Sequence, residues 1–343
     1  MMGTAQAHLC ASFVIPCYNL GQYLPEAVDS VLAQTRTDYE LLIVDDGSTD
    51  PHTREALEAC ARRGLQVLRQ ENRGLAAARN AGVARARGAF ICCLDADDRL
   101  RPEYLERAAA VLESRPEVGF ASSYYREFGE HESLVEQSDC QFPRLLVENR
   151  AMVSSLFRKQ AWEQVGGYCE DFSVPGYEDW DLWISLVEAG WECAVVPEVL
   201  FEYRVRSGSM YRTGLQDPEK LGETVQALAR RHRESYARYA VEVVGGLNAY
   251  CADLLHRLSA LELDVTWWRR QAQNWQAETE ARDRAIAGLK GWIETLQAEK
   301  DRLEAGAARQ QAGASGRIFR RPQAFLRRLQ ARLRPAPRLN KEG

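Results

Sequence analysis

The chain has 343 residues, of which 45% are hydrophobic and 27% charged, and its net charge is −5. This length suffices for one large or two medium domains, and the composition is ordinary for a globular protein. No apolar stretch reaches 18 residues, so we expect no transmembrane helix. The first eleven residues lack the basic and apolar regions of a signal peptide, and the nine cysteines include no CxxC pair. We therefore expect a cytoplasmic protein with reduced cysteines.

Strands and helices alternate along the first part of the chain. Short apolar runs predict buried strands at residues 13–16, 41–44, 65–68 and 91–94. Helical patterns fill the intervals, at residues 25–32, 53–63 and 74–87. We expect Leu32 on the inner face of the first helix and Gly88 as the C-cap of the third. This repeat predicts an α/β fold with an open, mainly parallel sheet flanked by helices.

The next part of the chain is less regular. Further helices are expected at residues 102–114, 159–165 and 182–189, and further strands at residues 118–122, 151–156 and 193–196. Residues 123–150 are polar and predict an excursion over a cleft. Residues 203–210 predict a polar loop, in which Arg204 and Arg206 suit phosphate binding or a lid.

Three polar loops follow three of the predicted strands, at residues 17–21, 45–50 and 95–98. In open α/β sheets the ligand crevice lies outside the carboxyl ends of the strands, so we expect these loops to converge on one cleft. The chain has neither a GxGxxG sequence after its first strand nor a GxxxxGK[ST] loop. Both absences count against a dehydrogenase and against a P-loop NTPase.

The stretch 91–98 joins four apolar residues to three carboxylates. If the strand continued, Asp95 and Asp97 would point to the same side, roughly 6–7 Å apart. Carboxylates this close repel each other, and a hard divalent cation that carries phosphate oxygens would relieve the repulsion. The alternative is a solvated turn, in which aspartate is common for conformational reasons.

A second acidic group, at residues 178–181, precedes an apolar helix. Asp179 falls near the N-terminus of that helix, where the helix dipole favours the ionised carboxylate. A functional carboxylate fits this position. An ordinary N-cap is the alternative explanation.

Five segments, in this order, resemble those of glycosyltransferase family 2, whose members have the GT-A fold. Each is weak alone, but five in the family's order make a specific match. The resemblance covers residues 12–210 and does not extend to residues 216–343. The matching segments are Val14–Asn19, Val44–Asp50, Asn72–Asn80, Leu94–Asp98 and Glu178–Asp181.

The resemblance implies roles for individual residues. Asp46 would contact the base of a nucleotide-sugar donor, and Asp95 would face the ribose. Asp97, assisted by Asp98, would hold Mg²⁺ or Mn²⁺ on the diphosphate, and Asp179 would remove the proton of the acceptor hydroxyl. Further donor contacts would be Pro16, Tyr18, Arg79 and Ala96. Contacts to phosphate or acceptor would be Glu178, Trp180, Arg204 and Arg206.

The resemblance also implies an inverting, metal-dependent, hexosyltransferase-like enzyme. It would act on a glycan or lipid-linked acceptor during polysaccharide or lipopolysaccharide assembly, and no nucleic acid partner is expected. A cation offsets the charge that grows on a diphosphate leaving group, and a carboxylate base suits an attacking hydroxyl. Many family members have a histidine where this chain has Arg206, which is expected to contact phosphate only.

Two other function classes fit parts of the chain. The first is a non-catalytic GT-A-fold scaffold that acts through a C-terminal coiled coil; the intact acids argue against it. The second is a nucleotidyltransferase, which shares the α/β cleft but requires a glycine- and lysine-rich loop after the first strand. That loop is absent from the sequence.

Residues 254–303 carry a heptad repeat of apolar residues, which predicts a coiled coil of roughly 75 Å. It would join copies of the chain or bind an assembly protein; a long helix folded back on the catalytic domain is the alternative. From Arg317 the chain is basic and amphipathic, which predicts peripheral contact with the inner face of the cell membrane, or else a disordered tail. The expected divisions are a catalytic domain at 12–215, a helical extension at 216–250, a coiled coil at 251–305, and a linker and tail at 306–343.

Overall fold

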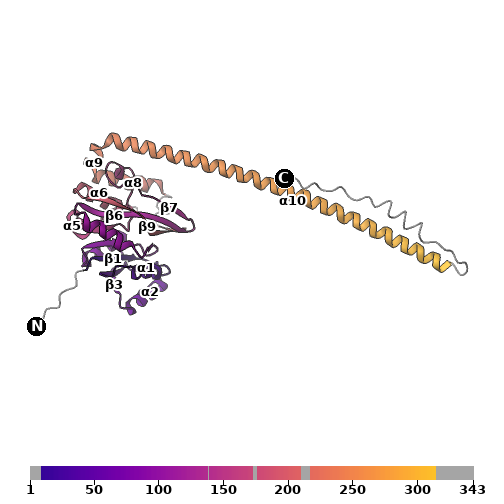
Figure 1. The fold of residues 1–343 in the computed structure, drawn as a ribbon, viewed down its shortest axis with the longest axis horizontal. Helices are drawn as coiled ribbons and strands as arrows, with labels where there is room; N and C mark the ends of the chain where they lie inside the picture. The colour runs from indigo at the N-terminus through magenta and orange to yellow at the C-terminus, as the bar shows by residue number, and fades with distance from the viewer. Residues whose placement is uncertain (1–8, 138, 173–175, 210–216, 314–343) are drawn as a thin grey trace. The chain divides into compact units, whose positions relative to one another are not determined.

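The computed structural model describes residues 9–137, 139–172, 176–209 and 217–313 (Figure 1). It divides into two compact units on either side of Leu254. The first unit contains a sheet with helices on both faces, and the second contains the greater part of one long helix.

One sheet organises the first unit. Its parallel half consists of β1, β2, β3 and β4, paired in the order β3-β2-β1-β4; the sequence predicted a mainly parallel sheet but not this order. The other half is mixed, because β8 runs antiparallel to both β4 and β6 while β9 runs parallel to β6. The described strands are β1 (Ala11–Cys17), β2 (Tyr39–Asp45), β3 (Gln66–Arg69), β4 (Phe90–Cys93), β5 (Arg99–Leu100), β6 (Val118–Gly129), β7 (Ser133–Val135), β8 (Leu156–Arg158) and β9 (Glu192–Val205).

Helices cover both faces of this sheet (Figure 1). Those that bury apolar side chains on one face are α1 (Leu24–Leu32), α2 (Pro51–Arg62) and α4 (Tyr104–Ser114). Those on the other face are α3 (Leu75–Arg85), α5 (Lys159–Val165), α6 (Glu178–Glu188) and α8 (Pro218–Arg231). The short helices η1 (Arg144–Leu146) and α9 (Arg233–Arg238) complete the unit.

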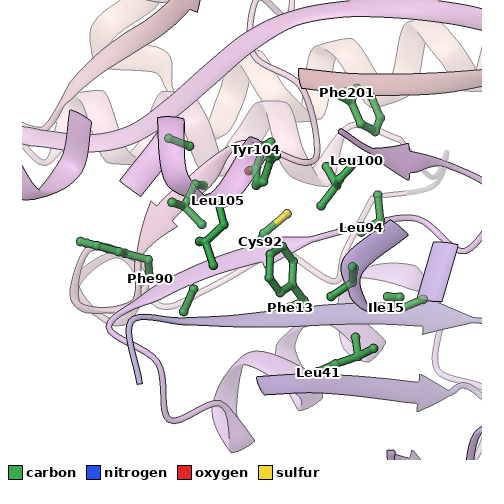
Figure 2. Close-up of a cluster of buried hydrophobic side chains, with 14 of the residues drawn as sticks. Phe13, Ile15, Leu41, Phe90, Cys92, Leu94, Leu100, Tyr104, Leu105 and Phe201 are labelled. Carbon is green, nitrogen blue, oxygen red and sulfur yellow. The ribbon is translucent and has the colours of Figure 1, made fainter. Parts of the chain in front are cut away.

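The central strand β1 is buried along its whole length, which explains its continuous apolar sequence. Because side chains alternate along a strand, Phe13 and Ile15 enter the core on one face and Val14 enters the core on the other. Figure 2 shows Phe13 in the same cluster as Tyr104 of α4, and their ring centroids lie 6.4 Å apart. This buried frame fixes the positions of the loops that leave the strands.

The structure corrects the prediction for the acidic stretch. β4 ends at Cys93, and the residues after it form a turn in which the amide of Asp98 donates to the carbonyl of Asp95 at 3.1 Å. The alternation argument for Asp95 and Asp97 therefore does not apply. The prediction for Leu32 was also wrong, because this side chain is 42% exposed.

Gly88 is not a helix cap, because α3 already ends at Arg85. A Cβ atom on Gly88 would lie 2.3 Å from the carbonyl carbon of Ala11, so glycine is needed where the chain passes close to β1. The strand expected at 151–156 was also misplaced: β8 begins only at Leu156, the last residue of that range.

Two strands of the second half are much longer than predicted. β6 runs on to Gly129, into the expected polar excursion, and β9 runs to Val205, so that Arg204 lies in a strand and not in a loop. The two strands pair with each other along most of their length, which extends both beyond their apolar cores. Local hydrophobicity gave no signal for this pairing.

Cys140 and Cys193 form a disulfide with a Cα–Cα distance of 5.8 Å. The prediction that all cysteines are reduced was therefore wrong. The two residues are 53 positions apart and belong to no short motif, so that only the fold brings them together.

The second unit continues helix α10 (Ala240–Gly313), a single helix of 74 residues. The helix predicted over the heptad region is confirmed, but the linker expected from residue 306 was wrong as far as Gly313, because the alanines there favour helix. The predicted basic tail lies outside the described residues. None of the described helices is long and apolar enough to cross a membrane.

Candidate active site

The loops after β1 and β2 are held together by Asn19. This residue adopts a positive φ of 54°, and its side-chain oxygen accepts from the amides of Thr49 and Asp50, both at 2.9 Å. Asp50 also caps α2, accepting from the amide of Thr53 at 2.9 Å. The two loops therefore form one rigid rim at the carboxyl edge of the sheet.

Asp46 joins this rim to the start of α3. Its carboxylate is buried and accepts from the side chain of Gln70 at 2.7 Å and from the amides of Arg73 and Gly74 at 2.9 Å each. Gly74 has a φ of +92°, a conformation that glycine adopts without strain. Asp46 thus fixes the chain reversal that leads into α3.

The other predicted donor contacts differ in accessibility. Tyr18 is 43% exposed at the rim, whereas Pro16 and Ala96 are buried. An exposed phenol can stack on a planar ligand. The two buried residues can shape the site only through their backbone and packing.

Arg79, in the second turn of α3, lies fully buried between two acids. Its guanidinium donates to Asp95 at 2.7 Å and also to Glu178. Burial by itself would lower the pKa of Arg79, but the charges of these two carboxylates outweigh it and hold that pKa well above its ordinary value. The arginine therefore stays charged and ties the turn after β4 to the first turn of α6.

Glu178 is committed to contacts within the protein. One of its oxygens accepts from Arg79, and the other accepts from the amide of Gly176 at 2.7 Å. The side chain is almost completely buried. In this arrangement Glu178 positions α6 and the loop before it.

Two acids of the turn after β4 face the two arginines at the end of β9. Arg206 donates to the Oδ2 of Asp97 at 2.7 Å. Asp98 accepts from the amide of Arg204 at 2.7 Å. Arg204 also donates to the carbonyl of Asp97 at 2.7 Å, so the predicted phosphate contacts enclose the acidic turn.

Burial and neighbouring carboxylates raise the pKa values of these two acids. Burial, followed by repulsion from Asp95, raises the pKa of Asp97. Burial and the charge of Asp97 likewise hold the pKa of Asp98 well above its usual range. In the described part of the chain, the Oδ2 of Asp98 is buried without a hydrogen-bond partner.

Asp179 lies within the first turn of α6, behind Tyr177 as the N-cap residue. It accepts from the amide of Trp180 at 2.8 Å and from the side-chain amide of Asn149 at 3.0 Å. Burial, reinforced by the charge of Glu178, raises the pKa of Asp179 to about 7. Tyr177 occupies the cap position, so Asp179 is not the N-cap residue, although it accepts from a first-turn amide.

Trp180 is held in place beside this acid. Its indole nitrogen donates to the carbonyl of Leu145 at 2.6 Å, and its ring centroid lies 5.8 Å from that of Tyr177. The tryptophan therefore links α6 to the segment that contains Asn149. Its predicted contact with phosphate or acceptor stays a prediction.

The acids gather at one edge of the sheet. Cys17 at the end of β1 pairs in register with Asp45 at the end of β2, and Val14 pairs with the end of β4. Burial raises the pKa of Cys17 to about 12, and the charges of both Asp45 and Asp97 add to the shift, because the two loops lie close to this thiol. Arg79 completes the group by linking α3, the β4 turn and α6.

Sequence reasoning missed several residues that build this site. Asn19 ends one of the five matching segments but was given no role, and Asn149 offers little signal, since asparagine is common in loops. His232 is the third, and its buried ring bonds to Asp181 at 3.0 Å and to Glu188 at 2.9 Å. It lies 51 residues beyond Asp181, so that nothing in the local sequence announces the contact.

Two family models match the chain. One is described as glycosyl transferase family 2 and covers residues 12–164; the other is described as glycosyl transferase family group 2 and covers residues 90–261. The chain belongs to glycosyltransferase family 2. The resemblance found from the five motifs is thereby confirmed.

A chondroitin synthase and a succinoglycan biosynthesis protein are among the known proteins that are similar to this chain. Chondroitin synthase of Escherichia coli is 33% identical over 186 residues, covering 52% of this chain and 26% of its own. The succinoglycan biosynthesis protein ExoO of Rhizobium meliloti is 29% identical over 218 residues, covering 59% and 62%. The chain spans less than half the length of the first curated relatives that it matches.

A solved structure supports the fold. The mannosyltransferase PcManGT of Pyrobaculum calidifontis, in complex with GDP-Man and Mn²⁺, superposes with a TM-score of 0.53 at 22% identity, covering 75% of this chain and 81% of its own. The GT-A fold expected from the sequence is therefore confirmed for this chain.

Proposed function

We propose that this protein transfers a sugar from a nucleoside-diphosphate donor to an acceptor hydroxyl, with inversion at the sugar carbon, during polysaccharide assembly. The observation that carries the proposal is the ion-pair bridge from Asp95 through Arg79 to Glu178. It holds the acidic turn after β4 beside the first turn of α6, where Asp179 lies. Groups suited to the leaving group and to the attacking hydroxyl therefore share one site.

The donor fits the rim formed by the loops after β1 and β2. We assign the base to the neighbourhood of Asp46 and Tyr18, the latter exposed for stacking on a planar ring. Asp95 would accept from the ribose through the carboxylate oxygen that Arg79 leaves unused. Arg204 and Arg206 are well placed to meet phosphate oxygens, because both already border the acidic turn.

The residues present fit a divalent cation. No group of three or more His, Cys, Asp or Glu side chains forms a ready cation site among the described residues. Mg²⁺, however, is commonly held by one or two carboxylates together with substrate phosphates. Asp97 and Asp98 supply such a pair, since their pKa values are raised and the Oδ2 of Asp98 has no hydrogen-bond partner in the described chain.

A cation bound there would place positive charge beside the diphosphate leaving group. Arg206 forms an ion pair with the carboxylate of Asp97. We expect this arginine to move toward phosphate when the donor binds. That exchange of partners makes the metal site dependent on the donor. It agrees with the finding that the described residues contain no preformed group of three or more metal-binding side chains.

Asp179 suits the role of general base. A base works best when its pKa lies near the working pH, and burial brings Asp179 to about 7. Asn149 and the amide of Trp180 orient the carboxylate, which would accept the proton of the attacking hydroxyl. With this base on one side of the sugar and the leaving group on the other, transfer would be a single displacement with inversion.

A non-catalytic scaffold explains these features less well. Buried carboxylates with raised pKa values cost folding free energy, and they concentrate at functional sites. A protein that only presented its long helix would gain nothing from retaining Asp98 and Asp179. The assignment to polysaccharide assembly rests on the relatives named above.

A thermal-shift screen of nucleoside-diphosphate sugars, with and without Mn²⁺, tests the proposal. A donor at 100 times its Kd stabilises by about 2.7 kcal/mol, or roughly 5–10 °C for a unit of this size. We expect one donor to produce this shift only with Mn²⁺, and Asp97→Asn to abolish it. Asp29→Asn, an exposed change on α1, is the control and should keep the shift. Stabilisation by no donor, or equal stabilisation without the metal, contradicts the proposal.

A further inference from the structure

From Leu254 onward, α10 carries an apolar stripe, and within the second unit α10 is the only described element. Its large apolar side chains are 42–61% exposed. They are Leu254, Leu258, Leu261, Val265, Trp268, Trp275, Ile286, Leu289, Ile293 and Leu296. A stripe of this length on an isolated helix marks a surface that binds protein, because a helix alone is only marginally stable in water.

The stripe follows a heptad repeat, written a to g with Leu258 at position a. Positions a include Val265, Ile286 and Ile293, and positions d include Leu261, Leu289 and Leu296. β-Branched residues at a with leucine at d favour two parallel strands over three or four. Where the stripe follows this pattern, its composition favours two helices over three or four in a parallel coiled coil.

Charges beside the stripe match a second copy of the same helix. In a parallel pair, position g of one helix faces position e of the next heptad on the other. Asp264 at g would face Arg269 of the second copy, and Arg257 at g would face Glu262. Both are pairs of opposite charge, so this first part of the stripe is complementary to a second copy in register.

Charged residues at positions a and d of the stripe would also lie beside opposite charges in the pair. Arg282 at d would be flanked by Glu278 and Asp283, which would otherwise repel each other across the pair. Lys300 at a would lie beside Glu299 of the second copy. Polar residues at seam positions lower stability but fix the register of a coiled coil.

We propose that α10 binds α10 of a second copy of this chain as a parallel, in-register, two-stranded coiled coil. The pairing makes the enzyme a homodimer and is independent of the transfer reaction. In a parallel pair, the two chains would enter the coil at the same end.

The first experiment measures the mass of the full chain by sedimentation equilibrium. We expect twice the 38.8 kDa of one chain. The double variant Leu261→Asp, Leu289→Asp removes two leucines at d from each helix and should weaken the dimer by more than about 1,000-fold. The control is Leu263→Asp, the same change at position f, where the side chain is 73% exposed and points away from the seam.

The second experiment reads direction and register. In a Cys251→Ser background, Ala272→Cys places a thiol at position a, and oxidation by copper phenanthroline in air should join two chains through a disulfide. Arg270→Cys at position f is the control and should form no cross-link. An antiparallel pair would separate the two Cys-substituted positions.

A monomer at 100 µM overturns the proposal, as does a dimer that survives the double Leu→Asp variant. A trimer or tetramer overturns the two-stranded assignment. A dimer in which Ala272→Cys fails to cross-link overturns the parallel register. Neither readout uses activity, so failure here is distinguishable from failure of the proposed function.

Discussion

The sharpest test of the site is Asp179→Asn, because it predicts opposite effects on activity and on stability. The change keeps the shape of the side chain but removes the charge. A general base contributes roughly 10²–10⁴-fold to the rate, so we expect transfer to fall by about that factor. Donor binding should persist, since the proposed donor contacts lie at the strand ends and not on this side chain.

The stability effect follows from the sign of the pKa shift. The unfolded carboxyl group titrates near 3.8 and the folded group near 7, so between these pH values the folded protein binds the extra proton. Folding stability therefore falls as the pH rises through this window and stays low above it. A shift of about three units corresponds to roughly 4 kcal/mol as an upper bound.

Asparagine avoids this cost but loses one accepted hydrogen bond, worth about 1 kcal/mol. We expect Asp179→Asn to be more stable than the wild type by up to roughly 3 kcal/mol at pH 8, or about 6–12 °C in Tm. At pH 4 the advantage should vanish. Asp171→Asn, a change at an exposed position, is the control and should alter neither stability nor activity.

The assays are release of the nucleoside diphosphate as a function of pH, and thermal unfolding at pH 4 and pH 8. The wild-type rate should rise about tenfold per pH unit below 7 and level off above it. A variant that retains more than a tenth of the wild-type rate contradicts the assignment of the base. A variant with a lower Tm than the wild type at pH 8 contradicts the raised pKa of the buried Asp179 carboxyl group.

Three further predictions concern the residues around this acid and the frame. Asn149→Ala removes a hydrogen bond that lowers the pKa of Asp179, so the midpoint of the pH–rate profile should move to higher pH; an unchanged midpoint rejects the contact. The pKa of His232 is raised, because the carboxylates of Asp181 and Glu188 outweigh the effect of its burial. The stability that His232 contributes to the folded state is therefore complete below pH 6.5 and is lost as the pH rises through the folded pKa. His232→Gln should therefore cost roughly 3 kcal/mol at pH 6 and less at pH 9, by denaturant unfolding. Gly88→Ala should destabilise the fold by about 3 kcal/mol or more, because the added methyl group clashes with β1. Gly222→Ala, on α8 where the added methyl group meets no other atom, should stabilise the fold by up to about 1 kcal/mol. Equal effects of the two changes would refute the packing argument.

The local sequence was sufficient for the parallel half of the fold. Apolar runs that are buried on both faces have few alternatives to a central parallel strand, and β1, β2 and β4 formed where predicted. The polar loops follow these strands directly, so their shared edge was also predictable. The heptad period likewise predicted that residues 254–303 are helical, as they are in α10.

The ends of several strands and the partners of several side chains depend on contacts between segments that are distant in the sequence. β6 and β9 extend because each pairs with the other, and β8 lies between β4 and β6 as a strand of three residues. The disulfide and the His232 contacts join segments about 50 residues apart. No pattern within one segment contains such information.

The sequence by itself determined which acids lie at the ends of the strands and which residues make the heptad stripe, because these depend on period and order along the chain. Only the tertiary structure decided their chemical state. Arg79 is charged, Glu178 is committed to internal contacts and Asp179 titrates near 7 because burial removes water and leaves each group to the charges packed around it. Those neighbours come from different elements, and only folding brings them within reach.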